Sequence, residues 1–246
     1  MLTLHRKTFL LDRLARDGRL HAADLAAELG TSEDTIRRDL RDLAAQGLLV
    51  RVHGGALPAS PTHVSLAARQ GIHAGDKERL GRTAAQLLRD GQIVIIDGGT
   101  TNLALVTALS KSLRVTVVTH SPGIAAALEH HALIEVILIG GRIFRHSMVA
   151  LGAETQNAYS RIRADICLLG VTGLHPDTGM TTGDAEEARL KATMVEAAAE
   201  TVVLATADKL GVTSPWQIAP LARLGRLVAR GERPGWLPDR TEFVPV

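Results

Sequence analysis

Residues 32–56 read SEDTIRRDLRDLAAQGLLVRVHGGA, and this stretch decides the fold of the amino-terminal part of the chain. It begins with Ser32, a residue type that caps helix N-termini, and the two acidic residues that follow complement the helix dipole. An apolar stripe comes next, at spacings of four and three residues, formed by Ile36, Leu40 and Leu43. The stretch is strand-like from Leu48 to Val52 and then reaches a Gly-Gly turn. The sequence therefore predicts a capped helix, ended by Gly47, and a β-hairpin after it.

Two shorter helical segments precede this stretch. The first carries an apolar face that includes Phe9 and Leu14 and stops near Asp17-Gly18. The second runs from about Ala22 to Leu29, and a glycine breaks it. Two helices, a glycine break, a third capped helix and a hairpin follow the order of a winged helix-turn-helix. We therefore expect an α+β winged helix-turn-helix domain over residues 1–57.

The face of the third helix opposite its apolar stripe is rich in arginine. With Ile36 placed at zero and about 100° per residue, Arg37, Arg38 and Arg41 fall at roughly 100°, 200° and 140°. Such a helix packs on one side and offers guanidinium groups to phosphates or guanine edges on the other. The candidate DNA-binding residues are Ser32, Asp34, Thr35, Arg37, Arg38, Arg41, Arg51, His53 and Gly54. The alternative is a solvated face with surface ion pairs.

Composition limits the possible functions. The 246 residues carry 28 Lys and Arg against 26 Asp and Glu, so any DNA binding must come from a few well-placed charges. Six aromatic residues are too few for base-stacking platforms. Cys167 is the single cysteine, which excludes an intrachain disulfide and a cysteine-based zinc cluster. No apolar run approaches the ~20 residues that span a bilayer, and no secretion signal is evident. We expect a cytoplasmic protein without membrane, metal or cofactor.

The remainder of the chain alternates between strands and helices. Residues 58–75 are interpreted as a linker, with a short helix near residues 65–70, and residues 76–246 as a second domain. The expected strands are Ile93–Asp97, Val115–Thr119, Val136–Ile139, Asp165–Gly170 and Thr201–Thr206. The expected helices lie near residues 77–89, 101–110, 122–130, 153–161 and 184–200. This alternation predicts an α/β domain with a mostly parallel sheet.

The expected strands end in glycine and small polar residues, and these ends share one edge of a parallel sheet, where ligands bind. Glycine amides and threonine hydroxyls before a helix can hold a phosphate, and lysine or arginine can add charge. The candidate effector-binding residues are Asp97, Gly98, Gly99, Thr100, Thr101, Thr119, His120, Ser121, Gly140, Gly141, Arg142, Lys191 and Lys209. The spacing is not that of a P-loop or a dinucleotide-binding fingerprint. Simple turns and solvated charges are the alternative, more so for Arg142 than for Lys209.

The run Thr35–Leu40, with Arg51–Ala56 after it, resembles the DeoR-type (GlpR-type) bacterial transcriptional regulators. The second half resembles that family's sensor domain, similar in fold to ribose-5-phosphate isomerase and glucosamine-6-phosphate deaminase. This second resemblance is carried by Asp97 with Gly99-Thr100-Thr101, Thr119, Ser121, Gly140-Gly141, Asp165 with Gly170, Gly179, and Lys209-Leu210-Gly211. His120 and Gly98 depart from the asparagine and serine usual in the family.

The resemblance implies a regulator, usually a repressor, whose helix-turn-helix spans about Leu20 to Asp39 and binds double-stranded operator DNA. It implies a phosphorylated sugar or related metabolite as effector, a carbohydrate operon as target, and a homo-oligomer, either dimer or tetramer. Two alternatives stay open. One is a sugar-phosphate isomerase or deaminase, with Glu186 or Glu187 as its base; the other is an assembly or DNA-compacting protein. We expect a regulator and not an enzyme, because a pure enzyme needs no winged helix.

Overall fold

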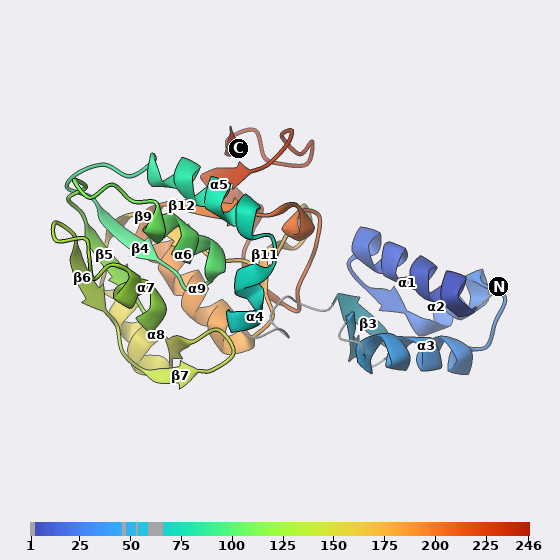
Figure 1. The fold of residues 1–246 in the computed structure, drawn as a ribbon. Helices are drawn as coiled ribbons and strands as arrows, with labels where there is room; N and C mark the ends of the chain where they lie inside the picture. Colours follow the sequence, from blue (N-terminus) through green and yellow to red (C-terminus); the bar gives the residue numbers. More distant parts are fainter. Residues whose placement is uncertain (1–2, 46–47, 53, 59–65) are drawn as a thin grey trace.

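The computed structural model describes residues 3–45, 48–52, 54–58 and 66–246. The amino-terminal helices and strands form one body and the rest of the described chain forms another, each with its own apolar core (Figure 1). Gly47, predicted to end a helix, and His53, a candidate DNA-binding residue, lie outside the described residues.

The amino-terminal body combines helices with a small antiparallel sheet. Its elements are α1 (Thr3–Asp17), β1 (Leu20–His21), α2 (Ala22–Glu28), α3 (Glu33–Ala45), β2 (Leu49–Val52) and β3 (Gly55–Pro58). The strands lie in the order β1-β3-β2. Helix, strand, two helices and a two-stranded wing make this a winged helix-turn-helix, as the sequence predicts. The pattern did not reveal β1, because two residues carry no periodicity.

Local chemistry explains where α3 begins and how it packs. The backbone N–H of Thr35 donates to the hydroxyl of Ser32 over 3.2 Å, so the predicted N-cap is confirmed. Ile36, Leu40 and Leu43 are at most 2% exposed and pack with the apolar residues of α1 and α2. The apolar stripe therefore faces the core.

Glycine at position 55 is required by the wing. β3 pairs with β1 through Gly55 and His21, and a Cβ on Gly55 would lie 1.7 Å from the carbonyl oxygen of Leu20. Gly54, in the turn before it, has a φ of 78°, which L-residues rarely adopt. Glycine is therefore needed at these two positions for different reasons, the close approach of another strand at Gly55 and a left-handed backbone conformation at Gly54.

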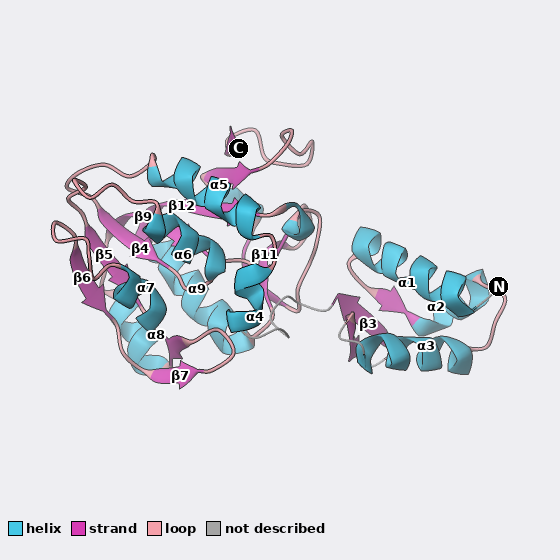
Figure 2. Cartoon of the chain, in the orientation of Figure 1, coloured by secondary structure: helices cyan, strands magenta, loops and turns pink. Residues whose placement is uncertain are grey.

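The carboxy-terminal body is built on a seven-stranded sheet whose neighbouring strands all pair in parallel (Figure 2). The sheet strands are β4 (Ile93–Ile96), β5 (Thr116–Thr119), β6 (Glu135–Leu138), β9 (Ala164–Leu169), β12 (Ala198–Ala205), β14 (Arg226–Ala229) and β15 (Glu242–Pro245). Their order is β15-β14-β12-β9-β4-β5-β6. The chain runs outward from β4 to β6 and returns to β9 on the other side of β4. The carboxyl ends of β4 and β9 are therefore the topological switch point, where open α/β sheets bind ligands.

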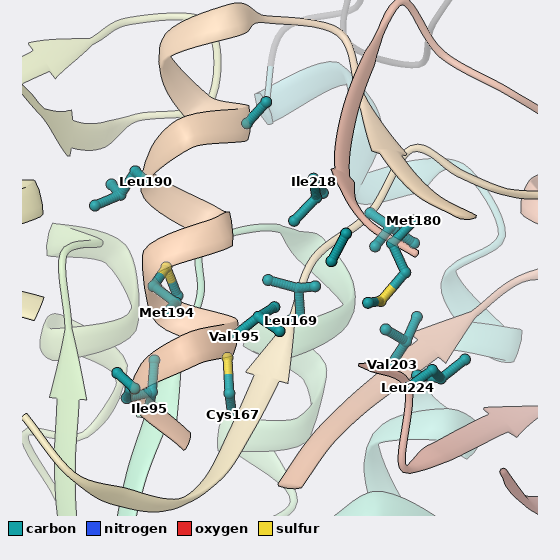
Figure 3. Close-up of a cluster of buried hydrophobic side chains, with 14 of the residues drawn as sticks. Ile95, Cys167, Leu169, Met180, Leu190, Met194, Val195, Val203, Ile218 and Leu224 are labelled. Carbon is teal, nitrogen blue, oxygen red and sulfur yellow. The ribbon is translucent and has the colours of Figure 1, made fainter. Parts of the chain in front are cut away.

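Helices cover both faces of this sheet. They are α4 (Leu66–Gly71), α5 (Ala74–Ala85), α6 (Thr100–Thr107), α7 (Pro122–Ala127), α8 (Ala153–Ser160) and α9 (Ala185–Ala197). Successive sheet residues point to opposite faces, so Val94 and Ile96 join the core with α5, α6 and α7. Ile95 and Cys167 join the opposite core with α8 and α9 (Figure 3). The inner strands β4, β5 and β9 are mostly buried, as a parallel sheet covered on both faces requires, whereas the edge strand β6 is exposed along its whole length.

Several elements differ from the sequence prediction. The helix expected to reach residue 200 ends at Ala197, and β12 begins at once, because Ala198 and Glu200 pair with β9. The pattern missed β14 and β15 of the main sheet and several short elements, namely β7 (Arg142–Phe144), β8 (Val149–Leu151), β10 (Gly173–His175), β11 (Gly179–Thr182) and β13 (Trp216–Ala219). β7 and β8 form a hairpin, and β10-β11-β13 form a separate small sheet. The short helix predicted near residues 65–70 is α4, and α5 begins at Ala74, inside the segment predicted as a linker.

Candidate functional site

The face of α3 that points away from its core is exposed and cationic. Arg37, Arg38 and Arg41 are all exposed. The Arg37 Nη2 donates to Glu33 Oε1 over 2.6 Å, one turn earlier on the same helix. Arg38 and Arg41 have no ion-pair partner among the described residues. These two guanidinium groups are therefore the ones most available to a DNA groove or phosphate.

Asp39 lies on the other side of α3 and anchors the helix. Its carboxylate is buried and accepts a hydrogen bond from Arg6 Nε of α1. That hydrogen bond raises the pKa of the Arg6 guanidinium, against a smaller opposing effect of burial. Asp39 orients an arginine, and the pair fixes α3 against α1.

The remaining candidate DNA residues lie near the start of α3 or on the wing. Asp34 is exposed, while the hydroxyls of Ser32 and Thr35 lie 2.8 Å apart and form a hydrogen bond with each other. Arg51 on β2 and Gly54 in the hairpin turn are exposed. His53 cannot be placed, since it lies outside the described residues. The assignment of these residues to DNA contact stays a prediction.

A cavity of about 90 Å³ opens at the carboxyl ends of β4 and β9. Seven of the candidate effector residues line it: Asp97, Gly98, Gly99, Thr100, Thr101, Lys191 and Lys209. Sequence reasoning did not assign to an effector site others that line the same cavity, among them Arg69, His73, Lys77, Thr182 and Asp208, and it named Glu187 only as the base of the enzyme alternative. These residues come from α4, the α4–α5 junction, α5, β11, α9 and the turn after β12, which only the fold brings to one edge.

The start of α6 faces this cavity with free backbone donors. Gly99 precedes the helix with a φ of 113° and supplies no side-chain cap. Its carbonyl accepts from Leu103 N over 3.0 Å, which leaves the amides of the first turn without intrahelical partners. Thr100 and Thr101 line the cavity in this turn. The helix dipole and these amides favour an anion there.

Asp97 closes the bottom of the site and is almost fully buried. Its carboxylate accepts from the N–H of Gly98 over 2.7 Å and from the N–H of Gly170 over 2.8 Å. Lys191 Nζ lies 3.2 Å from Asp97 Oδ2 and also donates to the Gly170 carbonyl over 2.8 Å. Asp97 therefore ties the ends of β4 and β9 to α9. With four partners, counting His120 at 3.5 Å, it has the bonding of a structural carboxylate.

His120, Thr119 and Ser121 lie beneath the cavity and do not line it. His120 Nδ1 is 3.1 Å from the Tyr159 hydroxyl, and burial lowers the pKa of His120 to about 4, although Asp97 opposes the shift. The imidazole is therefore neutral at pH 7. Thr119 Oγ1 donates to the Ile96 carbonyl over 2.7 Å, and Ser121 Oγ caps α7. These contacts stabilise β5 and α7, which gives the three residues structural roles in this arrangement.

Gly140, Gly141 and Arg142 also lie outside the cavity lining. Thr155 Oγ1 donates to the Gly140 carbonyl over 2.8 Å. Arg142 Nη2 donates to Glu186 Oε2 over 2.6 Å in an exposed ion pair. The end of β6 therefore does not meet the ends of β4 and β9, because β6 is at the edge of the sheet and β4 and β5 lie between it and β9.

The cavity holds more cations than carboxylates. Arg69, Lys77, Lys191 and Lys209 line it together with Asp97, Glu187 and Asp208. Burial lowers the pKa of Lys209 to about 8, against an opposing effect of Asp208 and with help from the neighbouring lysines and Arg69. For Lys191, burial is outweighed by Asp97 and Glu187, which raise the pKa of that amine. The site carries uncompensated positive charge that an anionic ligand can neutralise.

The described residues also lack two features, a metal site and a membrane-spanning helix. No group of three His, Cys, Asp or Glu side chains there forms a possible metal site. In the same part of the chain, no helix combines the length and apolar character needed to cross a membrane.

Comparisons with known proteins agree with this architecture. The DeoR-like helix-turn-helix domain matches residues 6–62, and the DeoR C terminal sensor domain matches residues 72–230. The chain is 32% identical to the HTH-type transcriptional regulator GlpR of Haloferax volcanii, across 94% of this chain and 91% of that protein. It is 29% identical to the glycerol-3-phosphate regulon repressor of Escherichia coli, across 86% and 84%.

Two solved structures resemble part of this chain. Ribose 5-phosphate isomerase A from Methanocaldococcus jannaschii is 18% identical over 55% of this chain and 53% of its own, with a TM-score of 0.40. A probable sor operon regulator from Shigella flexneri is 12% identical over 59% and 80%, with a TM-score of 0.40.

A winged helix-turn-helix followed by a sensor domain defines a ligand-responsive, DNA-binding transcriptional regulator. This chain belongs to the DeoR family of such regulators, as its sequence predicts.

Proposed function

We propose that this regulator is the repressor of a sugar or carbohydrate operon, and that a phosphorylated sugar or related metabolite binds in the cavity and changes its affinity for operator DNA. The observation that carries the proposal is the excess of cations around the uncapped start of α6. The names of the relatives support it, because one is a glycerol-3-phosphate regulon repressor and another, from Bacillus subtilis, is the HTH-type transcriptional repressor GlcR.

In this proposal each part of the cavity has a separate task. The amides and hydroxyls of Thr100 and Thr101 hold the phosphate, and Lys209 supplies compensating charge. Asp97 cannot hold phosphate, because both are anionic, and it positions the loop through its bonds to two backbone amides. The buried Glu187 lines the same cavity and can accept hydrogen bonds from sugar hydroxyls.

The DNA-binding part of the proposal places α3 in the major groove. Arg38 and Arg41 contact phosphates or guanine edges, Arg37 supports them, and Arg51 on the wing reaches a neighbouring phosphate. We further propose a division into residues 1–57, 58–75 and 76–246, and a dimer or tetramer formed by the last of these. Such a protein acts in the cytoplasm, where operator DNA and phosphorylated sugars occur together.

A thermal-shift panel tests the effector proposal. Glycerol 3-phosphate, glucose 6-phosphate, fructose 1-phosphate, fructose 6-phosphate and ribose 5-phosphate are compared with the same compounds without phosphate. At least one phosphorylated member should raise the melting temperature, and its unphosphorylated partner should not. A panel in which sugars act equally with and without phosphate contradicts the proposal.

Variants place the ligand in the cavity. Thr100→Val and Lys209→Ala should each weaken binding, because they remove a hydroxyl donor and a charge. Thr107→Val, at the other end of α6, and Lys111→Ala, on the exposed loop after it, are the matched controls and should bind as the wild type does. If both cavity variants keep wild-type binding, the effector site lies elsewhere.

The alternative of an enzyme is tested with the same ligands. We propose that the cavity binds without catalysis, because Asp97 is bonded to two amides and a lysine and is not free to act as a base. Glu187 and Asp208 are the other carboxylates of the cavity lining, and Glu187 is the base that the enzyme alternative names. Incubation with ribose 5-phosphate, followed by nuclear magnetic resonance for ketose formation, should show no turnover, and turnover that Glu187→Gln abolishes would support the enzyme.

A further inference from the structure

The effector cavity is partly lined by the segment that leads from the DNA-binding body. Arg69 on α4 and His73 at the start of α5 both line it. The backbone carbonyl of Arg69 accepts from Lys77 Nζ over 2.6 Å, which fixes this residue against α5. Arg69 therefore belongs both to the cavity lining and to α4, the first described helix after the DNA-binding body.

The guanidinium of Arg69 is only partly satisfied. Its Nη2 donates over 3.3 Å to the His146 carbonyl, in the turn between β7 and β8. Its Nε is buried and has no hydrogen-bond partner among the described residues. On the same cavity, Thr182 Oγ1 of β11 is also buried without a hydrogen-bond partner in the described part of the chain, and Thr182 is fully inaccessible to solvent. Buried polar atoms without partners are costly, and two on one cavity point to a ligand that supplies them.

Backbone strain occurs on both segments that Arg69 joins. Among the described residues, His73 and Met148 are the two non-glycine residues with positive φ, at 52° and 51°. His73 follows α4, and Met148 lies in the β7–β8 turn next to Ser147, which lines the cavity. Non-glycine residues in this conformation cost free energy and concentrate at ligand clamps and switch regions.

The charges around Arg69 select the ligand chemistry. Lys77, Lys191 and Lys209 are its cationic neighbours, and Glu187 and Asp97 are the carboxylates that act on it. Burial lowers the pKa of Arg69, yet a guanidinium stays charged at pH 7. An oxyanion offsets the repulsion within this group of cations, and the planar fork of arginine binds phosphate or carboxylate through two parallel hydrogen bonds.

We propose that Arg69 is an effector-binding residue that couples the sensor to the DNA-binding domain: the effector's anionic group accepts from Arg69 and thereby fixes α4 to the β7–β8 turn. The proposal rests on the proposed function of the cavity as an effector site. In this proposal the position of α4 carries the signal from the effector, because α4 directly precedes α5 and its Arg69 contacts the ligand. Without Arg69, a bound ligand should therefore no longer order α4.

The experiment uses the full chain at pH 7.5 with inorganic phosphate as the probe and chloride at equal ionic strength as the blank. Thermal shift measures the phosphate midpoint, and hydrogen exchange measures the protection of residues 66–73 and 145–149. In the wild type, phosphate should slow exchange in both segments. Arg69→Ala should raise the midpoint about tenfold, since a charged hydrogen bond is lost, and should abolish the added protection at saturating phosphate. Arg69→Lys keeps the charge without the fork and should fall between the two.

Arg82→Ala, which removes an exposed arginine from α5, is the matched control and should leave both readouts unchanged. Wild-type midpoint and protection in Arg69→Ala would overturn the inference while the cavity proposal stands, provided that Thr100→Val still weakens phosphate binding. A raised midpoint with full protection of residues 66–73 would make Arg69 a ligand contact and overturn its coupling role. No effect of phosphate on the wild type would overturn the anion-binding cavity itself.

Discussion

Effector binding should weaken as the pH rises from 7 to 9, because Lys209 loses its proton in this range. The amine lines the cavity, and burial lowers its pKa to about 8. Asp208 opposes the shift, while Lys191, Lys77 and Arg69 add to it. A bound phosphate dianion stabilises the charged amine and so raises the pKa of Lys209 in the complex. Binding above pH 8 must therefore take up a proton, and it becomes less favourable as protons become scarce.

The magnitude follows from the fraction of charged amine. With a pKa of about 8, Lys209 is roughly nine-tenths protonated at pH 7 and roughly one-tenth protonated at pH 9. The second pKa of a phosphate monoester is near 6, so the ligand keeps its full charge throughout this interval. The association constant should fall about tenfold between pH 7 and pH 9, equivalent to about 1.4 kcal/mol.

Isothermal titration calorimetry measures this change with the phosphorylated sugar that gives the largest thermal shift. Titrations at pH 8.5 in two buffers of different ionisation enthalpy count the protons taken up on binding. Lys209→Arg is the matched variant, because it keeps the positive charge and cannot titrate in this range. It should bind at pH 9 about as well as at pH 7. Lys77, whose pKa burial also lowers, shifts the wild type in the same direction, and the variant isolates the part due to Lys209.

Two results would refute this reasoning. One is an association constant that changes by less than twofold between pH 7 and pH 9 in the wild type. The other is a tenfold fall that persists in Lys209→Arg, which would assign the titration to another group in the cavity.

The remaining predictions concern DNA contact and stability. Arg38→Ala should weaken operator binding by about 1–3 kcal/mol in a gel-shift or anisotropy titration at fixed salt, and Arg82→Ala should not. In the wild type, the free energy of unfolding should fall by on the order of 3 kcal/mol between pH 6.5 and pH 4, because His120 takes up a proton only when the protein unfolds. His120→Asn should remove this dependence on pH. Chemical denaturation across the range measures the free energy of unfolding, and an unchanged slope in the variant refutes the prediction. Asp39→Ala should destabilise the winged helix by about 1–3 kcal/mol, because it removes the charged hydrogen bond that joins α3 to α1, and a thermal melt with wild-type unfolding of this domain would contradict that.

Most of the main helices and strands of both parts of the chain could be predicted from its sequence. Ser32 and the Ile36-Leu40-Leu43 stripe predict α3 correctly, because capping and helical periodicity are local properties. The apolar strands that end at Asp97 and Gly170 were likewise found from alternation with helices. Since parallel strands end at one edge, these two positions could be placed together in advance, and Gly170 N does donate to Asp97.

The sequence could not predict which side chains contact one another around the cavity. Thr119 and His120 follow a neighbouring strand, yet their side chains bond inward to Ile96 and Tyr159 instead of facing the ligand edge. Arg142 follows a strand end as well, and it pairs with Glu186 on the surface. Strand ends predict proximity, but the direction of each side chain depends on the twist and packing of the elements around it.

The sequence by itself determined the fold class, the recognition helix and the glycine-threonine turn before α6, because each rests on residues near one another in the chain. Only the tertiary structure decided that Arg69 and Thr182 line the same cavity as the predicted Lys209. They are separated by more than a hundred residues from first to last, and no local pattern links a linker arginine, a strand hydroxyl and a loop lysine. The order of strands in the sheet brings them together, and that order is set by the burial of apolar surface over the whole domain.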